Sequence, residues 1–199
     1  MKTNFFYPFF FVVLIAFIFL TACEQNYSPK PRGYFRIDLP QKSWIKYDSL
    51  QQYNFEYPEY AVVMPDPTSP TDESWLNIEF PQMKASLHLS YKKLNNNLNV
   101  FIEDARTMAM KHLPKANAIT DSIISFEEAN IYGTLYQIGG KGVASPLQFY
   151  VTDSANHFVR GALYFNIRPN NDSIEPLIHF VKADVLHFMQ TLEWKQPVR

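Results

Sequence analysis

Apolar and polar residues alternate over several short stretches of the chain, a pattern typical of half-buried strands. The first stretch, Tyr34–Leu39, places its apolar residues on one face and ends at Pro40. Residues 153–156, Asp-Ser-Ala-Asn, favour a turn, so a hairpin is expected there. The other strand-like stretches and short apolar runs lie at 53–57, 60–64, 75–80, 85–91, 122–127, 131–139, 147–152 and 158–166.

The apolar positions change to a spacing of three or four residues in two places, which predicts two amphipathic helices. The first has Asn97 as its expected cap and Pro114 as its stop. The second is expected from about 174 to 192, with Ser173 as its cap and Trp194 closing the core beyond it. The predicted buried positions are Leu98, Phe101, Ala105, Met108 and His112 in the first helix and Leu177, Val181, Val185, Phe188 and Leu192 in the second.

This order of elements is several strands, one helix, about four strands and a second helix. Runs of strands with tight connections indicate an antiparallel sheet, and two helices with one apolar stripe each must cover it. We therefore expect a single α+β domain from residue 34 to 196. Its layout resembles the PsbP-like fold, an α-β-α sandwich that is also seen as a binding module in other lipoproteins.

The N-terminus has the features of an export signal. Lys2 precedes an apolar run, Phe5–Leu20, which leads into Leu-Thr-Ala-Cys at 20–23. This ending resembles the bacterial lipobox, in which the peptide is cut before the cysteine and the thiol receives lipid such as palmitate-bearing diacylglycerol. Residues 1–22 are thus expected to be a signal peptide and 23–33, with two prolines, a lipidated tether. The alternative is an uncleaved short membrane anchor.

Composition narrows the function classes. The net charge is −1, which gives no reason to expect nucleic-acid binding. Cys23 is the single cysteine, so the chain forms no internal disulfide and no cysteine-rich metal site. The five histidines show neither HxH nor HExxH spacing; Asp184 and His187 are three residues apart, but solvated helix residues explain them better. No cofactor or metal is expected.

Two further side-chain patterns leave alternatives open. Ser145, Ser154, Asp153 and His157 lie close enough in sequence to suggest a Ser-His-Asp triad, but no GxSxG elbow is present and a turn needs these residue types anyway. Alternating tyrosines on the predicted strands indicate either an exposed interaction face or ordinary strand propensity. These are Tyr132, Tyr136, Tyr150 and Tyr164.

Several segments resemble one known family. They are SPKPRGYFRIDLP at 28–40, soon after the lipobox, HLSYK at 88–92, FIEDA at 101–105, the run at 144–165 and RPNNDS at 168–173. In this order they resemble the gliding motility lipoprotein GldD family. The resemblance implies a non-enzymatic envelope component of the Bacteroidota that is required for gliding and linked to type IX secretion. Of its functional residues only the lipidated cysteine carries over, as Cys23.

The first hypothesis is a lipid-tethered binding or assembly protein that contacts other gliding and secretion proteins of the envelope. Its domain is expected in the periplasm, anchored to the cytoplasmic or the outer membrane. Tyr34, Arg36, Asp153 and Arg160 are candidate partner-facing residues, although strand surfaces and turns explain them equally well. The rival hypotheses are a ligand-carrying lipoprotein with an apolar pocket between sheet and helix, and a Ser/His hydrolase. The sequence leaves the oligomeric state open.

Overall fold

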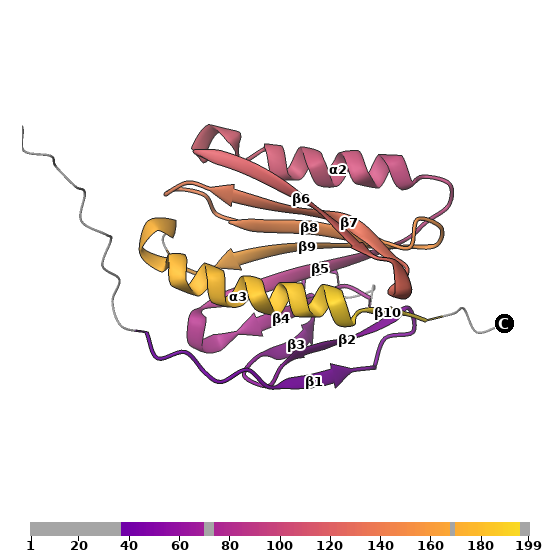
Figure 1. The fold of residues 1–199 in the computed structure, drawn as a ribbon, viewed down its shortest axis with the longest axis horizontal. Coiled ribbons are helices and arrows are strands. Elements are labelled where there is room, and N and C mark those ends of the chain that lie inside the picture. Colours follow the sequence, from indigo (N-terminus) through magenta and orange to yellow (C-terminus); the bar gives the residue numbers. More distant parts are fainter. Residues whose placement is uncertain (1–36, 70–73, 168–169, 196–199) are drawn as a thin grey trace, which may run out of the picture. The chain divides into compact units, whose positions relative to one another are not determined.

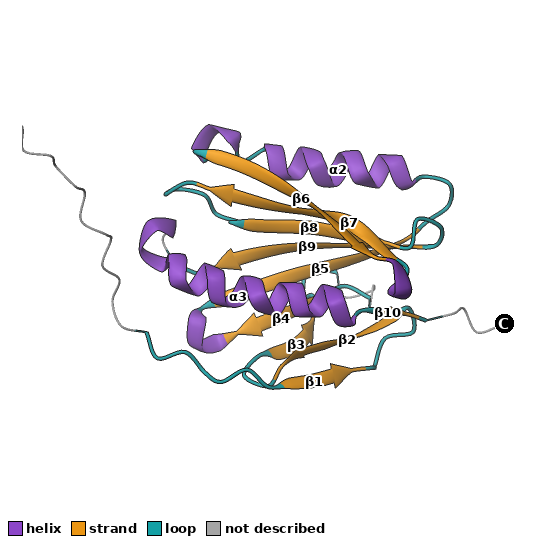
Figure 2. Ribbon diagram, in the orientation of Figure 1, coloured by secondary structure: helices purple, strands orange, loops and turns teal. Residues whose placement is uncertain are grey.

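Two antiparallel sheets and two long helices form the part of the chain that the computed structural model describes, residues 37–69, 74–167 and 170–195 (Figures 1 and 2). All these residues belong to one unit, Tyr34–Arg199. The strands are β1 (Trp44–Tyr47), β2 (Tyr53–Pro58), β3 (Val62–Pro65), β4 (Leu76–Phe80), β5 (Ala85–Lys93), β6 (Ala118–Phe126), β7 (Ile131–Gly139), β8 (Leu147–Thr152), β9 (His157–Phe165) and β10 (Glu193–Trp194). The helices are α2 (Leu98–Met110) and α3 (Asn171–Thr191), and short 3-10 turns lie at Pro81–Met83, Leu113–Lys115 and Glu127–Ala129.

The larger sheet has seven strands in the order β3-β4-β5-β9-β8-β7-β6, and the smaller has three in the order β1-β2-β10. Every neighbouring pair is antiparallel. The expected hairpin is present between β8 and β9, where Val151 pairs with Val159. The predicted α+β class, with antiparallel strands and two helices, is confirmed.

The two helices pack on opposite faces of the large sheet. Successive side chains of a strand point to opposite sides, so each face has its own apolar side chains for one helix to cover. On β8, Phe149 and its odd-numbered neighbours join the larger core cluster, which also contains Val185 and Phe188 of α3. Tyr150 joins the second cluster with Ala105 and Ala109 of α2. The result is three layers, α3, sheet and α2, with an apolar core on each side of the sheet.

The first predicted strand is wrong where the structure describes it. Ile37–Leu39 forms no strand, and Tyr34–Arg36 lies outside the described residues. Ile37 and Leu39 are 37% and 39% exposed, so the alternation does not reflect a buried face. This segment is anchored three residues later by Lys42, whose ammonium contacts the carboxylate of Asp184 on α3.

One of the two expected helix caps is confirmed in position and the other is wrong. Asn97 is the N-cap residue of α2 as expected, although its side chain accepts a hydrogen bond from the backbone N–H of Asn95 and makes no capping bond to the helix. Ser173 lies inside α3, which begins at Asn171 after Asn170. A serine at the cap would accept a hydrogen bond from a backbone N–H of the first turn. Here the Ser173 hydroxyl instead accepts one from the side-chain amide of Asn170.

The buried stripe of α3 follows the prediction, and that of α2 follows it in the N-terminal part of the helix. Val181, Val185, Phe188 and Leu192 are almost fully buried, and Leu177 is partly buried against the same core. In α2, Ala105 is buried and Leu98 and Phe101 pack against its cluster as predicted, but Ala109 is buried in place of Met108, which is 40% exposed, and His112 lies beyond the helix end. Small alanines face the sheet here because the sheet itself supplies the large side chains, such as Tyr150. Neither described helix is long and apolar enough to cross a membrane.

Candidate functional site

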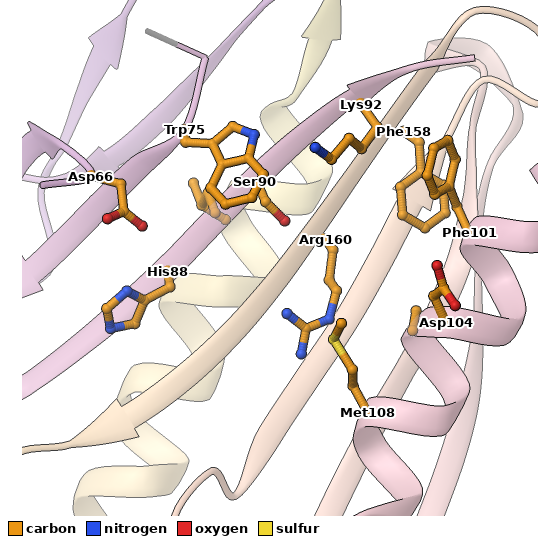
Figure 3. Close-up of a pocket in the computed structure, with 12 residues that line it drawn as sticks. Asp66, Trp75, His88, Ser90, Lys92, Phe101, Asp104, Met108, Phe158 and Arg160 are labelled. Carbon is orange, nitrogen blue, oxygen red and sulfur yellow. The ribbon is translucent and has the colours of Figure 1, made fainter. Parts of the chain in front are cut away.

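A cavity of about 320 Å³ opens beside α2, above the middle of the large sheet (Figure 3). Strands β5 and β9 form its floor, α2 forms one wall, and Trp75 with Asp66 forms the other. The complete lining is Asp66, Trp75, His88, Leu89, Ser90, Lys92, Phe101, Asp104, Ala105, Met108, Phe158 and Arg160. Its size lies within the range of small ligand sites.

Aromatic side chains make the cavity apolar at one end. The rings of Phe101 on α2 and Phe158 on β9 lie 5.5 Å apart. Trp75 is held in place from the opposite side, since its Nε1–H donates to the backbone oxygen of Tyr91 at 3.1 Å. The ammonium of Lys92 lies 4.5 Å from the Trp75 ring centre, a cation–π distance. These contacts fix the walls before any ligand arrives.

Arg160 lies on the floor between the two walls (Figure 3). Its strand register places it between Ser90 of β5 and Tyr150 of β8. Its Nη2 donates to Oε1 of Gln148 at 2.8 Å, but its buried Nε has no hydrogen-bond partner within the described residues. Burial lowers the pKa of Arg160, and Tyr164 opposes this shift only weakly. The guanidinium is therefore a desolvated cation that lacks a compensating carboxylate among the described residues.

The side chain of His112 contacts the same glutamine, Gln148, at its amide nitrogen. Gln148 accepts from Arg160 through Oε1, so its amide nitrogen faces Nε2 of His112 at 2.8 Å. An amide nitrogen donates, so the ring of His112 accepts and stays neutral. Burial, with the positive charges of Arg160 and Lys115, lowers the pKa of His112 and favours this state. Gln148 and His112 thus fix the position of the guanidinium from the α2 side of the sheet.

Two carboxylates also line the cavity, but neither forms an ion pair with Arg160 in the described chain. Asp66 accepts hydrogen bonds from the backbone and hydroxyl of Thr68. Burial alone raises the pKa of Asp66, but the Thr68 bonds, helped by His88, outweigh it and hold this pKa below its usual range. Asp104 is on the exposed wall formed by α2. The Asp66 carboxylate therefore stays ionised at neutral pH, and with the acidic side chain of Asp104 it limits how much anionic charge the cavity accepts.

A second hollow of about 580 Å³ continues the first along β9. The two hollows share His88 and Arg160, and the second extends to Tyr164 and Asn166. We call the two together the Arg160 groove. It runs along the sheet face that α2 leaves uncovered, apolar at the end near Phe158 and more polar at the other end.

Comparison with known proteins places this chain in a family. The sequence model of the gliding motility lipoprotein GldD family matches residues 24–194. The chain belongs to this family. As a GldD-family lipoprotein it is membrane-anchored and associated with the cell envelope. No curated protein matches the chain.

Among solved structures, the chain is similar to the cyanobacterial PsbP protein CyanoP from Synechocystis sp. PCC 6803, known from a solution structure. The two are 12% identical, with a TM-score of 0.43, and the match covers 75% of this chain and 95% of CyanoP.

Three of the five predicted site residues of this GldD-family chain, Cys23, Tyr34 and Arg36, lie outside the described residues. Arg160 lies on the groove floor. Asp153 is in the β8–β9 turn, where Oδ1 accepts from the backbone N–H groups of residues 155, 156 and 157. Burial raises the pKa of Asp153, but these three bonds outweigh it and the pKa stays below its usual range. Its carboxylate therefore serves the turn, and partner contact through it remains a prediction.

Three members of the suggested triad set, Ser145, Asp153 and His157, have other hydrogen-bond partners, and the backbone N–H of the fourth, Ser154, donates to the Thr152 hydroxyl in the turn. Nδ1 of His157 is 2.9 Å from the hydroxyl of Tyr91, and its ring stacks on Trp194. The Ser145 hydroxyl donates to the backbone oxygen of Leu147. Asp153 binds the backbone of His157 and not its ring. Within the described ranges, no interaction joins a serine hydroxyl to His157, and no three His, Cys, Asp or Glu side chains gather as a metal site.

Most of the groove cannot be predicted from the sequence. The strands that carry Trp75, His88 and Gln148 are predicted, but the register that aligns these residues with Arg160 is not visible in one sequence. The interpretation of the alternating tyrosines as an exposed face is wrong for two of them. Tyr136 and Tyr150 are only 6% and 8% exposed, since they pack in the cluster under α2.

Proposed function

We propose that this protein is a lipid-anchored, non-enzymatic binding or assembly component of the gliding apparatus and the associated type IX secretion machinery. Membership of the GldD family supports the gliding role. The Leu-Thr-Ala-Cys ending of the signal supports lipid on Cys23, with the domain tethered in the periplasm. Its partners are other envelope proteins of the same machinery.

The observation that carries the binding role is the Arg160 groove. Its walls are fixed aromatic side chains and its floor holds a cation without a counter-charge, which are features of recognition sites. Of the groups that a hydrolase would use, the Ser145 hydroxyl and the Asp153 carboxylate are bonded to backbone, and the His157 ring bonds to Tyr91 and stacks on Trp194. We therefore favour recognition over covalent chemistry.

The role is tested in the host bacterium by deleting the gene and restoring it in trans. Deletion is expected to abolish colony spreading and to retain type IX cargo in the cells, measured as cargo in the cell-free medium. The Cys23→Ala variant should fail to restore either function and should incorporate no radiolabelled palmitate. The matched control Asn26→Ala keeps the lipobox and should restore both. Normal spreading and secretion in a clean deletion would refute the proposal.

The alternative is a ligand-carrying envelope lipoprotein, favoured specifically by the cavity of about 320 Å³. In that case a small molecule bound beside α2 would be the cargo. Native mass spectrometry of the protein purified from its envelope distinguishes the two functions. A bound species of constant mass indicates a carrier, whereas an empty domain supports the binding or assembly role.

A further inference from the structure

We propose that the Arg160 groove binds an extended peptide segment of a partner protein that carries one internal acidic side chain, flanked by an aromatic or aliphatic one. The acidic side chain contacts Arg160, and the apolar one packs between Trp75 and Phe101. This inference rests on the proposed binding function and names the chemistry of the partner.

The charge of the groove floor selects an anion. The Arg160 guanidinium is half-buried, makes one hydrogen bond, to Gln148, and has no carboxylate partner among the described residues. A cation withdrawn from water without a counter-charge is costly, and a planar carboxylate relieves that cost with charge-assisted hydrogen bonds. Gln148 and His112 hold the guanidinium in place, so little side-chain entropy is lost when the ligand binds.

The flanking carboxylates restrict the anion to a single charge. Asp66 and Asp104 stand on opposite walls of the groove and repel a polyanion. Lys92 offsets them only in part, since its ammonium lies over the Trp75 ring. A nucleic acid or a run of acidic residues is therefore disfavoured, and one isolated Asp or Glu fits.

The length of the groove indicates an extended chain. Its lining on β9 runs from Phe158 to Asn166, just beyond the strand end. Eight residue steps of a strand span about 26 Å, the length of a similar number of peptide residues in extended form. Arg160 is shared by both hollows, so space continues on each side of it. The acidic group is thus an internal side chain and not a terminal carboxylate.

The change of polarity along the groove favours a peptide over a lipid. One end is lined by Trp75, Phe101 and Phe158, whereas the other presents His88, Tyr164 and Asn166. An acyl chain is apolar along its whole length and would leave the polar end unsatisfied. A peptide matches the change, because its side chains differ in polarity and its backbone offers hydrogen-bonding groups throughout.

The central test is Ser90→Glu in the full-length lipoprotein. Ser90 is the cross-strand partner of Arg160, so a glutamate there reaches the guanidinium and occupies it without removing any existing contact of Arg160. Ser90→Gln is the uncharged control of similar size. Arg106→Gln removes a positive charge from the exposed side of α2, where Arg106 pairs with Glu103. Arg160→Gln is the direct variant, and circular dichroism checks that it folds.

The probe is a displayed library of random twelve-residue peptides, selected on the wild-type protein. Selected peptides are expected to contain one internal Asp or Glu near an aromatic or aliphatic residue. Their affinity, measured by fluorescence anisotropy, should fall about tenfold or more for Ser90→Glu and Arg160→Gln. Ser90→Gln and Arg106→Gln should bind within about twofold of wild type, as expected where no charged contact is lost.

Three results would overturn the inference: no selected peptides, peptides without acidic enrichment, or equal binding by the folded Ser90→Glu variant. Binding of oleate or of phosphatidylglycerol vesicles that requires Arg160, without peptide binding, would also overturn it in favour of a lipid. The failure of the proposed function gives a different result. A deletion strain that spreads normally refutes the gliding role whatever the peptides do, whereas normal spreading of Ser90→Glu refutes only the groove.

Discussion

Two titratable side chains, the buried Asp184 and the half-buried Arg160, show how the fold treats groups withdrawn from water. Asp184 is 2% exposed and accepts hydrogen bonds from Lys42 and, at 2.6 Å, from the Tyr60 hydroxyl. Arg160 has a neutral amide as its only hydrogen-bond partner in the described chain. Buried charges that serve the fold are paired, as Asp184 is. An unpaired one is more often kept for binding, which is why Arg160 is the residue around which the proposed site is built.

The Asp184 pair gives the first prediction. Lys42→Met removes the ammonium and leaves the buried carboxylate with Tyr60 alone. We expect the free energy of unfolding at pH 7.5 to fall by about 3 kcal/mol, at the low end for a broken buried pair because Lys42 is 29% exposed. Urea denaturation measures this. Lys46→Met is the control, since Lys46 and Glu193 form an exposed pair, and it should leave stability nearly unchanged.

The loss of stability in Lys42→Met is also expected to depend on pH. Burial raises the pKa of Asp184, against the opposing effects of Lys42 and Tyr60. The folded state thus holds the proton more tightly than the unfolded chain, so this group stabilises the fold as pH falls and that stability is lost as pH rises through the folded pKa. Without Lys42 the pKa rises further. The deficit of Lys42→Met should therefore be smaller at pH 5 than at pH 7.5, and an equal deficit would contradict the buried pair.

At the scale of elements, the sequence predicts the features that depend only on the local spacing of apolar residues. The strands with clear alternation, such as 53–57 and 147–152, and the apolar stripe of α3 lie where expected. Ile37–Leu39 alternates equally well but has no partner strand in the structure, because pairing is decided by distant residues. The last buried positions of α2 differ from the prediction for a similar reason, since Ala109 and not Met108 is buried. Its alanines are buried only because Tyr150 and Phe158 fill the space beneath it.

The candidate site was less predictable than the fold. Arg160 is predicted from the sequence as a candidate partner-facing residue, but not as the centre of a groove. Its significance depends on Ser90, Gln148 and Trp75, which come from β5, β8 and the segment before β4. A single sequence gives the direction in which a strand side chain alternates, but neither the order nor the register of the strands beside it.

The β8–β9 pair gives the prediction at this scale. A Cβ atom on Gly161 would lie 2.2 Å from two ring atoms of Phe149, its register partner, which is 1% exposed. Gly161→Ala must therefore displace a buried ring that also packs on Phe188 of α3. We expect a loss of about 1–3 kcal/mol in the free energy of unfolding. Gly142→Ala is the matched control, because its nearest neighbour is Lys115 Cδ at 4.0 Å, and wild-type stability in both variants would contradict this packing.

At the scale of the whole unit, the smaller sheet ties the two ends of the described chain together. Strand β2 lies between β1 and β10, and Tyr53, which is fully buried, pairs with Trp194 near the C-terminus. Trp194 also donates from Nε1 to the backbone oxygen of Asn130 and stacks on His157 at 5.1 Å. Trp194 thus links β2, the residue before β7 and the β8–β9 hairpin.

Trp194→Ala should remove these contacts, lower the free energy of unfolding and change how that free energy depends on pH. We expect a loss of about 2 kcal/mol, less than for a fully buried tryptophan. Burial lowers the pKa of His157, against the opposing effect of Asp153, so the fold excludes a proton that the unfolded chain accepts.

In the wild-type protein, the contribution of the neutral His157 to stability is therefore present above about pH 6.5 and is lost as pH falls toward the folded pKa. Uncovering His157 returns its pKa toward the ordinary value, so the variant should lose less stability between pH 7.5 and pH 5. Trp44→Ala is the comparison, because Trp44 stacks on His187 instead and its removal leaves the Trp194–His157 stack in place. Equal slopes for all three proteins, measured by urea denaturation at both pH values, would show that Trp194 does not shield His157.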